Sequence, residues 1–168
     1  AGARRQIVVV FASFLLVEKF GFSVQNTVLL LIVNTIINML CAPYAGKLIE
    51  RFGEKLSLRF EYLSIIAIFT LYGLAQTQTM AVILYVLDNL FFTIAIALKT
   101  YFQKIADPKD IAVTSGVGFA INHIAAVSLP FTLGIVWMVS HSAVFFIGAA
   151  IGVLSFGLTF FINEESRA

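Results

Sequence analysis

Long apolar runs separated by short charged breaks restrict the fold of this chain more than any other feature. Residues 22–45 and 143–162 contain no charged side chain, residues 111–139 contain no Asp, Glu, Lys or Arg, and residues 80–98 contain only Asp88. A helix needs about 20 apolar residues to cross the hydrocarbon core of a bilayer. These runs therefore predict a polytopic membrane protein.

The predicted fold class is an all-α membrane helical bundle. Hydrophobic residues make up 60% of the chain and charged residues 12%, against about 25% charged residues in a soluble domain. Helices satisfy the backbone within the bilayer, and the runs lack the alternation of a membrane β-barrel. We expect one membrane domain over residues 1–168, with five full helices and one partial helix, at about 3–18, 22–45, 56–76, 80–103, 111–139 and 143–162.

The first apolar segment is too short to cross a bilayer, because residues 7–17 would form a helix of only about half its thickness. One interpretation is a signal peptide, with Arg4 and Arg5 before the apolar core. A re-entrant or interfacial helix is a second. The interpretation that we prefer is a helix whose first half is missing, so that the sequence begins in mid-membrane.

Basic residues are distributed unequally between alternate breaks. The breaks lie near residues 18–25, 46–59, 76–79, 103–110 and 140–142, and consecutive breaks face opposite sides of a membrane. Lys19 is the one base in the first, third and fifth breaks, whereas seven lie in the second break, the fourth break and the C-terminal tail: Lys47, Arg51, Lys55, Arg59, Lys104, Lys109 and Arg167. The positive-inside rule then predicts an inner-membrane protein with the charged loops and the C-terminus in the cytoplasm.

The second break carries a motif with a family resemblance. Its residues are Gly46, Glu50, Arg51, Gly53 and Lys55. This spacing resembles the cytoplasmic loop motif of the major facilitator superfamily, which follows the second helix of each six-helix half. Glu54 departs from it, because the family has a base at that position. A solvated charged loop is the alternative interpretation.

The resemblance implies that the chain is the C-terminal half of a transporter, clipped at its N-terminus. Family members have two six-helix halves that bind a small solute between them near mid-membrane. The runs 2–7 and 121–126 also resemble an uncharacterised bacterial branch of the family. The missing N-terminal half, or a second copy of the chain, would then be a partner, together with the bilayer and a small-molecule solute.

Several polar residues lie inside the apolar runs, where they are costly unless they face protein, water or a ligand. Asp88 and Asn89 lie midway along one predicted helix, and Asn122 and His123 lie midway along another. Asp88 is either a proton or substrate site or a buried acid held by a neighbouring helix. Histidine is a common proton carrier in proteins, so His123 could relay protons with Asp88, or it could form a helix–helix hydrogen bond.

Two further groups of polar residues are open to more than one interpretation. Thr27, Asn34, Asn38 and Cys41 form a stripe along one face of a predicted helix, which favours hydrogen bonding between helices. Arg4, Arg5 and Gln6 are ordinary flanking residues if the chain is complete. If it is clipped, the resemblance places them in a cavity-facing helix, where an arginine would suit an anionic substrate.

The sequence contains no enzyme signature that we recognise. It has no Gly-x-Ser-x-Gly, no His-Glu-x-x-His, no cysteine pair and no phosphate loop. We therefore expect no catalytic activity, no cofactor and no metal site, and the net charge of +2 does not suggest a nucleic-acid partner. The predicted function is secondary active transport by alternating access, with or without coupling to protons. The alternative is a half-size membrane protein that acts as a homodimer or as a non-transporting accessory subunit.

Overall fold

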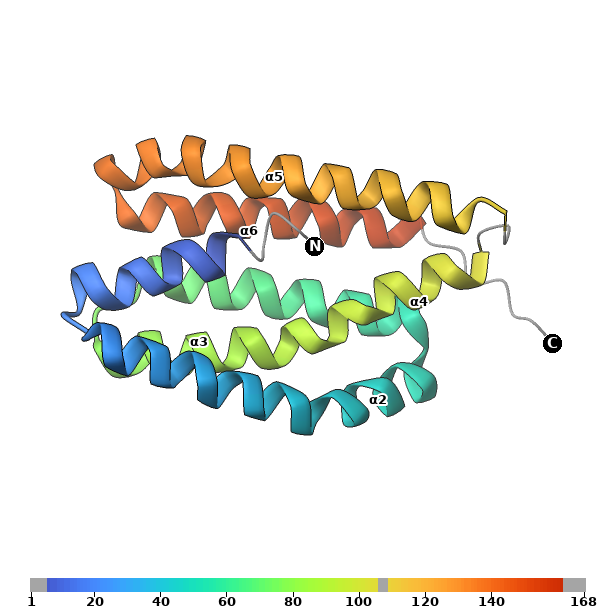
Figure 1. Ribbon diagram of the computed structural model, residues 1–168, viewed down its shortest axis with the longest axis horizontal. Coiled ribbons are helices and arrows are strands. Elements are labelled where there is room, and N and C mark those ends of the chain that lie inside the picture. The colour runs from blue at the N-terminus through green and yellow to red at the C-terminus, as the bar shows by residue number, and fades with distance from the viewer. Residues whose placement is uncertain (1–5, 106–108, 162–168) are drawn as a thin grey trace.

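The computed structural model describes residues 6–105 and 109–161, and all the regular elements within them are helices (Figure 1). The prediction of an all-α fold is therefore confirmed. The first helix consists of two π-helical segments, a short 3₁₀ turn joins α3 to α4, and another follows α6. The elements in chain order are η1 (Ile7–Ala12), η2 (Leu15–Lys19), α2 (Val24–Gly73), α3 (Gln78–Phe92), η3 (Thr93–Ala95), α4 (Ile96–Ile105), α5 (Ile111–Val139), α6 (His141–Leu158) and η4 (Thr159–Phe161).

Helix α2 folds back on itself at Gly53. Gly53 has φ 79° and ψ 163°, a conformation that glycine adopts without the steric cost of a Cβ atom. Two antiparallel arms result (Figure 1), a first arm of residues 24–52 and a second arm of residues 54–73. The expected loop over 46–59 is wrong. Leu, Lys, Glu and Arg on both sides of Gly53 are good helix formers, so the helices continue almost to the turn.

Hydroxyl side chains set three helix starts at one end of the bundle. The Oγ of Ser23 accepts from the backbone N–H of Asn26 before α2, and the Oγ1 of Thr77 accepts from the N–H of Met80 before α3. Ser140 caps α6 in the same way. Such caps satisfy N–H groups that have no partner inside the helix, so the helix boundaries here follow directly from the sequence.

Four helices among the described residues are long and apolar enough to cross a membrane: α2, Gln78–Phe102, α5 and His141–Phe161. Because α2 has 50 residues and turns back at Gly53, it is too long for one crossing of about 30 Å. The first helix starts midway along the bundle and runs to one end (Figure 1).

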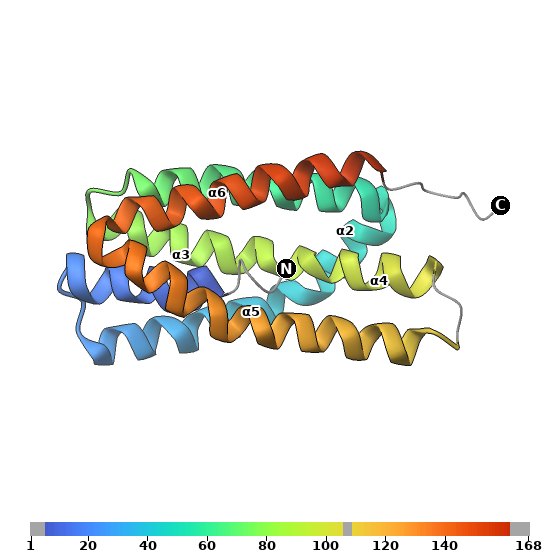
Figure 2. The ribbon, with the colours of Figure 1, turned by 90° about the horizontal axis from the view of Figure 1, so that it is seen from above.

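The connections alternate between the two ends of the bundle. The turn at Gly53, the start of α5 and the end of η4 lie at one end, which we call the basic end because Lys47, Arg51, Lys55 and Lys109 are there (Figures 1 and 2). The turns after η2, α2 and α5 lie at the other end, the hairpin end. This arrangement agrees with the alternation that the spacing of the breaks predicts.

The tightest packing joins the second arm of α2 to α6. Gly148 and Gly152 have the Gly-x-x-x-Gly spacing that lets helices approach closely. The ring of Phe69 lies directly against Gly148, and Ile65 and Ile66 lie against Gly152. The rings of Tyr72 and Phe145 stack at 4.8 Å between centroids. The second arm of α2 and α6 therefore form a closely packed pair of helices in the bundle.

The first helix is tied to the α5–α6 hairpin at the hairpin end. The indole Nε1 of Trp137 donates to Oε2 of Glu18 at 2.8 Å, and Nε2 of His141 lies 3.8 Å from Oε1 of the same carboxylate. The Trp137 ring also contacts the rings of His141 at 4.4 Å and Phe11 at 5.4 Å. Trp137 thus joins three helices.

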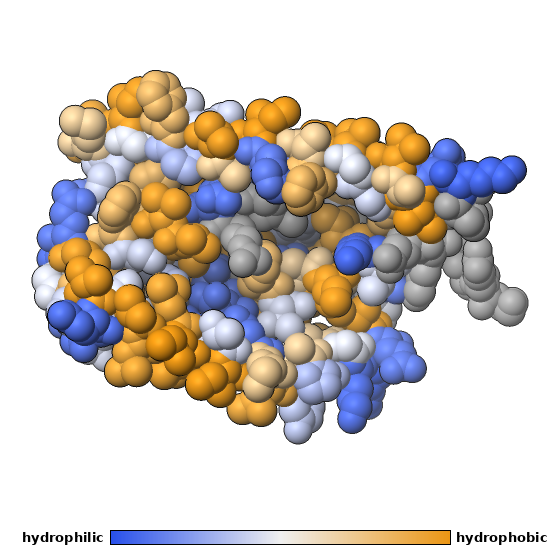
Figure 3. All heavy atoms as spheres, viewed as in Figure 1, coloured by the Kyte–Doolittle hydropathy of each residue, from blue (hydrophilic) through white to orange (hydrophobic). Residues whose placement is uncertain are grey.

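One broad face of the bundle is hollowed. In the view of Figure 3, apolar side chains cover the rims, and hydrophilic atoms gather at both ends and in the middle. The rims are α5 and the first arm of α2, whose large apolar residues are mostly exposed, such as Val127 (77%) and Met39 (69%). This face is where the candidate site opens.

Candidate functional site

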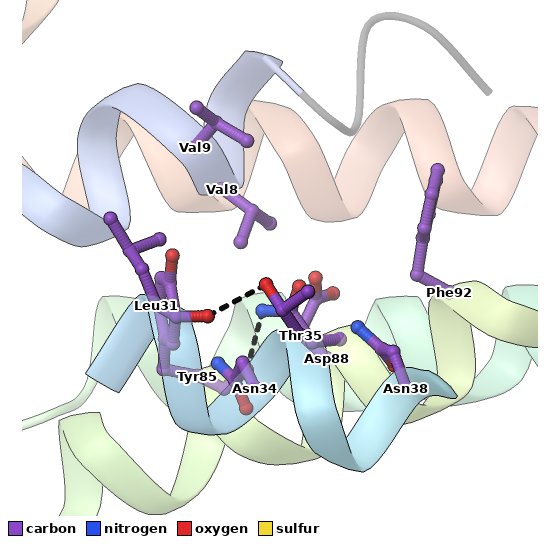
Figure 4. Close-up of a pocket in the computed structure, with 10 residues that line it drawn as sticks. Val8, Val9, Leu31, Asn34, Thr35, Asn38, Tyr85, Asp88 and Phe92 are labelled. Carbon is purple, nitrogen blue, oxygen red and sulfur yellow. Dashed lines mark hydrogen bonds between the residues drawn. The ribbon is translucent and has the colours of Figure 1, made fainter. Parts of the chain in front are cut away.

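A polar pocket of about 300 Å³ lies where the first helix, the first arm of α2 and α3 meet (Figure 4). Its lining residues come from these three elements: Val8, Val9, Leu31, Asn34, Thr35, Asn38, Tyr85, Asp88, Asn89 and Phe92. The helical period places the polar residues on one side of each helix, because positions three or four apart share a face. The pocket is therefore built from positions 31, 34, 35 and 38 opposite positions 85, 88, 89 and 92.

Asp88 is the buried acid of this pocket, with 3% of its surface exposed. Next to it, the side-chain amide of Asn89 donates to the backbone carbonyl of Tyr85 at 2.9 Å. The Tyr85 side chain is hydrogen-bonded to Ser13 of the first helix. Asp88 and Asn89, which are both candidates from the sequence, therefore line one polar cavity, and their role in binding or coupling stays a prediction.

Asn34 is a pocket residue whose side chain is buried without hydrogen bonds. It is 3% exposed, and within the described part of the chain neither its amide nitrogen nor its amide oxygen has a hydrogen-bond partner. A buried polar group without a partner costs about 1–3 kcal/mol. An amide offers both donors and an acceptor. The Asn34 amide therefore has donors and an acceptor free to bind a water molecule or a polar ligand in this pocket.

Two other polar residues of the first arm that line the pocket, Asn38 and Thr35, do make hydrogen bonds. The Oδ1 of Asn38 accepts from the Thr93 hydroxyl at 3.1 Å, which joins α2 to η3, and the Thr35 hydroxyl donates to the carbonyl of Leu31 at 2.9 Å. The interpretation of this stripe as hydrogen bonding between helices holds for Asn38. It fails for Thr27, which bonds within its own helix start, and for Asn34.

Asn122 and His123 do not line this pocket. Both are exposed on α5, and Nδ1 of His123 lies 3.1 Å from the carbonyl of Phe119 in its own helix. Within the described residues, the structure does not bring His123 into the pocket with Asp88, so it gives no support to a proton relay between them. In this part of the chain the hydrogen bond of His123 is made within α5 and not, as one interpretation of the sequence suggests, to a neighbouring helix.

The remaining candidates lie around the start of the chain. Arg4 and Arg5 lie outside the described residues. Gln6 is half-buried at the beginning of the first helix, two residues before Val8 of the pocket. The first helix therefore does contribute to the site, through Val8 and Val9.

The loop motif has a structural role at the basic end. Gly53 makes the turn of α2. Gly46 is exposed, with no atom among the described residues within 4 Å of where a Cβ would lie, so it is not a point of close helix approach. Arg51 lies over the ring of Phe52 at 5.5 Å. Glu54, the departure from the motif, is buried. Glu50 is exposed and Lys55 half-buried.

An all-helical bundle with apolar outer faces and a polar pocket halfway along it defines a multi-pass membrane protein. The family model of the Major Facilitator Superfamily matches residues 2–130, and the chain belongs to this family. This result confirms the resemblance seen in the loop motif. Members are membrane transporters and in general are carriers rather than enzymes. None of the curated proteins compared with the chain matches it.

Proposed function

We propose that this chain forms one six-helix half of a secondary active transporter and that the pocket around Asp88 and Asn34 binds the transported solute. The observation that carries the proposal is the buried Asn34 amide without a partner, in the same cavity as a buried carboxylate. A polar pocket halfway along apolar helices is costly to maintain unless it binds water, ions or a solute. Alternating access would open it to one side of the membrane at a time.

The proposed six helices are the first helix as a partial span, the two arms of α2 as two spans, α3 with α4, α5, and α6. Exposed polar residues on α5 support the proposal that a partner is missing. Asn122 and His123 are polar and exposed midway along α5, among side chains such as Ile121 and Ile124 that are 60% and 66% exposed. Polar groups are poorly tolerated against lipid, so we infer that the other half of the transporter covers them. His123 would then face the cavity from the rim formed by α5, whereas Asp88 lies on α3.

Proton coupling is part of this proposal. Asp88 is the acid that lines the described pocket, and a carboxylate that gains and loses a proton as the pocket opens to each side would couple solute to protons.

Arg4 and Arg5, which the resemblance places in the same cavity, would favour an anionic solute. Arg5→Ala should then weaken the binding of anionic solutes more than that of neutral ones.

The alternative assigns the exposed face to a second copy of this chain, giving a homodimer or an accessory subunit. An uptake experiment separates the two proposals. The 168-residue chain alone and the full-length product of its gene are reconstituted in liposomes and tested with labelled sugars, amino acids and organic anions. We expect saturable uptake only for the full-length product. Saturable uptake by the chain alone would favour the homodimer, and failure of both with every solute would contradict transport.

Orientation can be tested with single cysteines in a Cys41→Ser background, since Cys41 is the lone cysteine. Arg51 and Gln76 are exposed and lie at opposite ends of the bundle. Because the basic end is expected to face the cytoplasm, an impermeant maleimide added to intact cells should label Gln76→Cys and should label Arg51→Cys only after permeabilisation. The reverse pattern would show that the basic end faces outward.

A further inference from the structure

An apolar groove, separate from the polar pocket, lies at the basic end between the two arms of α2. It consists of two adjoining cavities of about 310 Å³ and 300 Å³ that share Leu48 and Phe60. The first cavity is also lined by Phe52, Leu56 and Ser57. The second continues towards α3 and η3, with Cys41, Tyr44, Ala45, Leu90, Phe91, Thr93 and Ile94.

The groove offers almost no hydrogen-bonding capacity. The hydroxyl of Ser57 donates to the carbonyl of Gly53 at 2.7 Å, and the hydroxyl of Thr93 donates to Asn38. The rings of Phe60 and Phe91 meet edge to face at 5.6 Å. Phe52, Leu56 and Phe60 are each about half exposed, at 49%, 53% and 49%. An occupant of this groove must therefore be an apolar chain.

Basic side chains border the groove in a regular pattern. Lys47 and Arg51 are four residues apart and each directly precedes a lining residue, Leu48 or Phe52. At 3.6 residues per turn, the two bases lie about 40° apart around the first arm, with the apolar pair about 100° further on. A contact supports this position for Arg51, because its guanidinium lies 5.5 Å from the centre of the Phe52 ring.

The acids near the groove are placed away from this border. By the same helical period, Glu50 projects from the side of the two bases that is opposite to the apolar pair. Glu54 and Glu61 are buried, at 7% and 3% exposed, and both are engaged in interactions. The rim of the groove is thus positive while its floor is apolar.

We propose that this groove binds an anionic phospholipid, with an acyl chain against Leu48, Phe52 and Phe60 and the phosphate against Lys47 and Arg51. A basic rim next to an apolar floor at the end of a membrane helix matches both parts of such a lipid, and juxtamembrane bases attract anionic headgroups. A soluble anion would use only the rim, and a zwitterionic lipid would gain less from two cations. The site does not depend on which solute the polar pocket binds.

The test is a lipid titration of the purified full chain in detergent, read by native mass spectrometry as the fraction of copies that carry one lipid. We expect dioleoyl phosphatidylglycerol to bind more tightly than dioleoyl phosphatidylcholine. The variant Lys47→Gln/Arg51→Gln should weaken binding of phosphatidylglycerol roughly 25-fold, since each juxtamembrane base contributes about 1 kcal/mol. Lys99→Gln, which removes an exposed base of α4 that does not line the groove, should leave it unchanged.

Three results would overturn the site. These are equal affinity for the two lipids, no change in the double variant, or complete displacement of the lipid by millimolar inorganic phosphate, which would indicate a free-anion site. Lys47 and Arg51 are exposed, so both variants are expected to fold, and an unchanged gel-filtration profile verifies this. An apolar variant, Leu48→Ser, should weaken binding of both lipids, because it removes part of the floor without changing the charge.

Discussion

Asp88→Asn is expected to abolish accumulation of solute against its gradient while leaving the protein folded. The substitution preserves the shape of the side chain in the pocket but removes the group that would exchange a proton. Uphill uptake driven by an imposed pH gradient should fall about tenfold or more, the effect of losing a coupling free energy of about 1–3 kcal/mol. Exchange of labelled for unlabelled solute, which needs no proton, should persist.

The matched control is Asp110→Asn. This residue undergoes the same chemical change but is exposed next to the start of α5 and does not line the pocket. It should transport like the wild type. Wild-type accumulation by Asp88→Asn would remove Asp88 from the coupling mechanism. If Asp88→Asn loses both accumulation and exchange while the protein stays monodisperse, Asp88 is instead a ligand of the solute.

Gly148→Leu is expected to have the largest effect on stability. A Cβ at Gly148 would overlap the ring of Phe69 and lie 3.3 Å from Cδ1 of Ile7, so the second arm of α2 and the first helix would both have to move. Overpacking of this kind costs about 1–3 kcal/mol or more. The midpoint of thermal unfolding in detergent should fall by at least several degrees, since about 1 kcal/mol corresponds to about 2–4 °C for a chain of this size.

Gly157→Leu is the control for that measurement. It lies in the same helix, has no atom within 4 Å of where a Cβ would lie, and adds the same side chain to the surface. Its unfolding midpoint should stay close to that of the wild type. Equal destabilisation by both substitutions would show that the cost arises within α6 and not from its contact with the second arm.

The length of the apolar runs predicts most of this fold from the sequence. The span 111–139 has the same bounds as α5, whereas the span 22–45 ends seven residues before the end of the first arm of α2, which runs to residue 52. The loop around the family motif is the main error. Charge suggests a solvated loop, yet the same Lys, Glu and Arg residues extend both arms of α2, and only Gly53 interrupts them. Charge shows where a chain leaves the bilayer, not where a helix ends.

The candidate site is predictable in part. Asp88 and Asn89 are recognisable because a polar pair inside an apolar run is costly. The importance of Asn34 cannot be read from its stripe, because Asn38 has the same periodicity and is satisfied by Thr93 on another helix. The contact of Glu18 with Trp137 spans 119 residues of sequence and has no local signal. The Gly-x-x-x-Gly spacing of Gly148 and Gly152 is a signal that does predict close packing.

The central claim is that Asn34 lies in a polar pocket that water and solute reach from one side of the membrane. Reactivity of Asn34→Cys, in a Cys41→Ser background and in native membranes, with a hydrophilic methanethiosulfonate reagent tests it directly, because only a thiolate in contact with water reacts. Ile32→Cys, on the opposite side of the same arm and 52% exposed, is the control. We predict reaction at position 34 and none at position 32. No reaction at position 34, or equal reaction at both, would contradict a polar pocket.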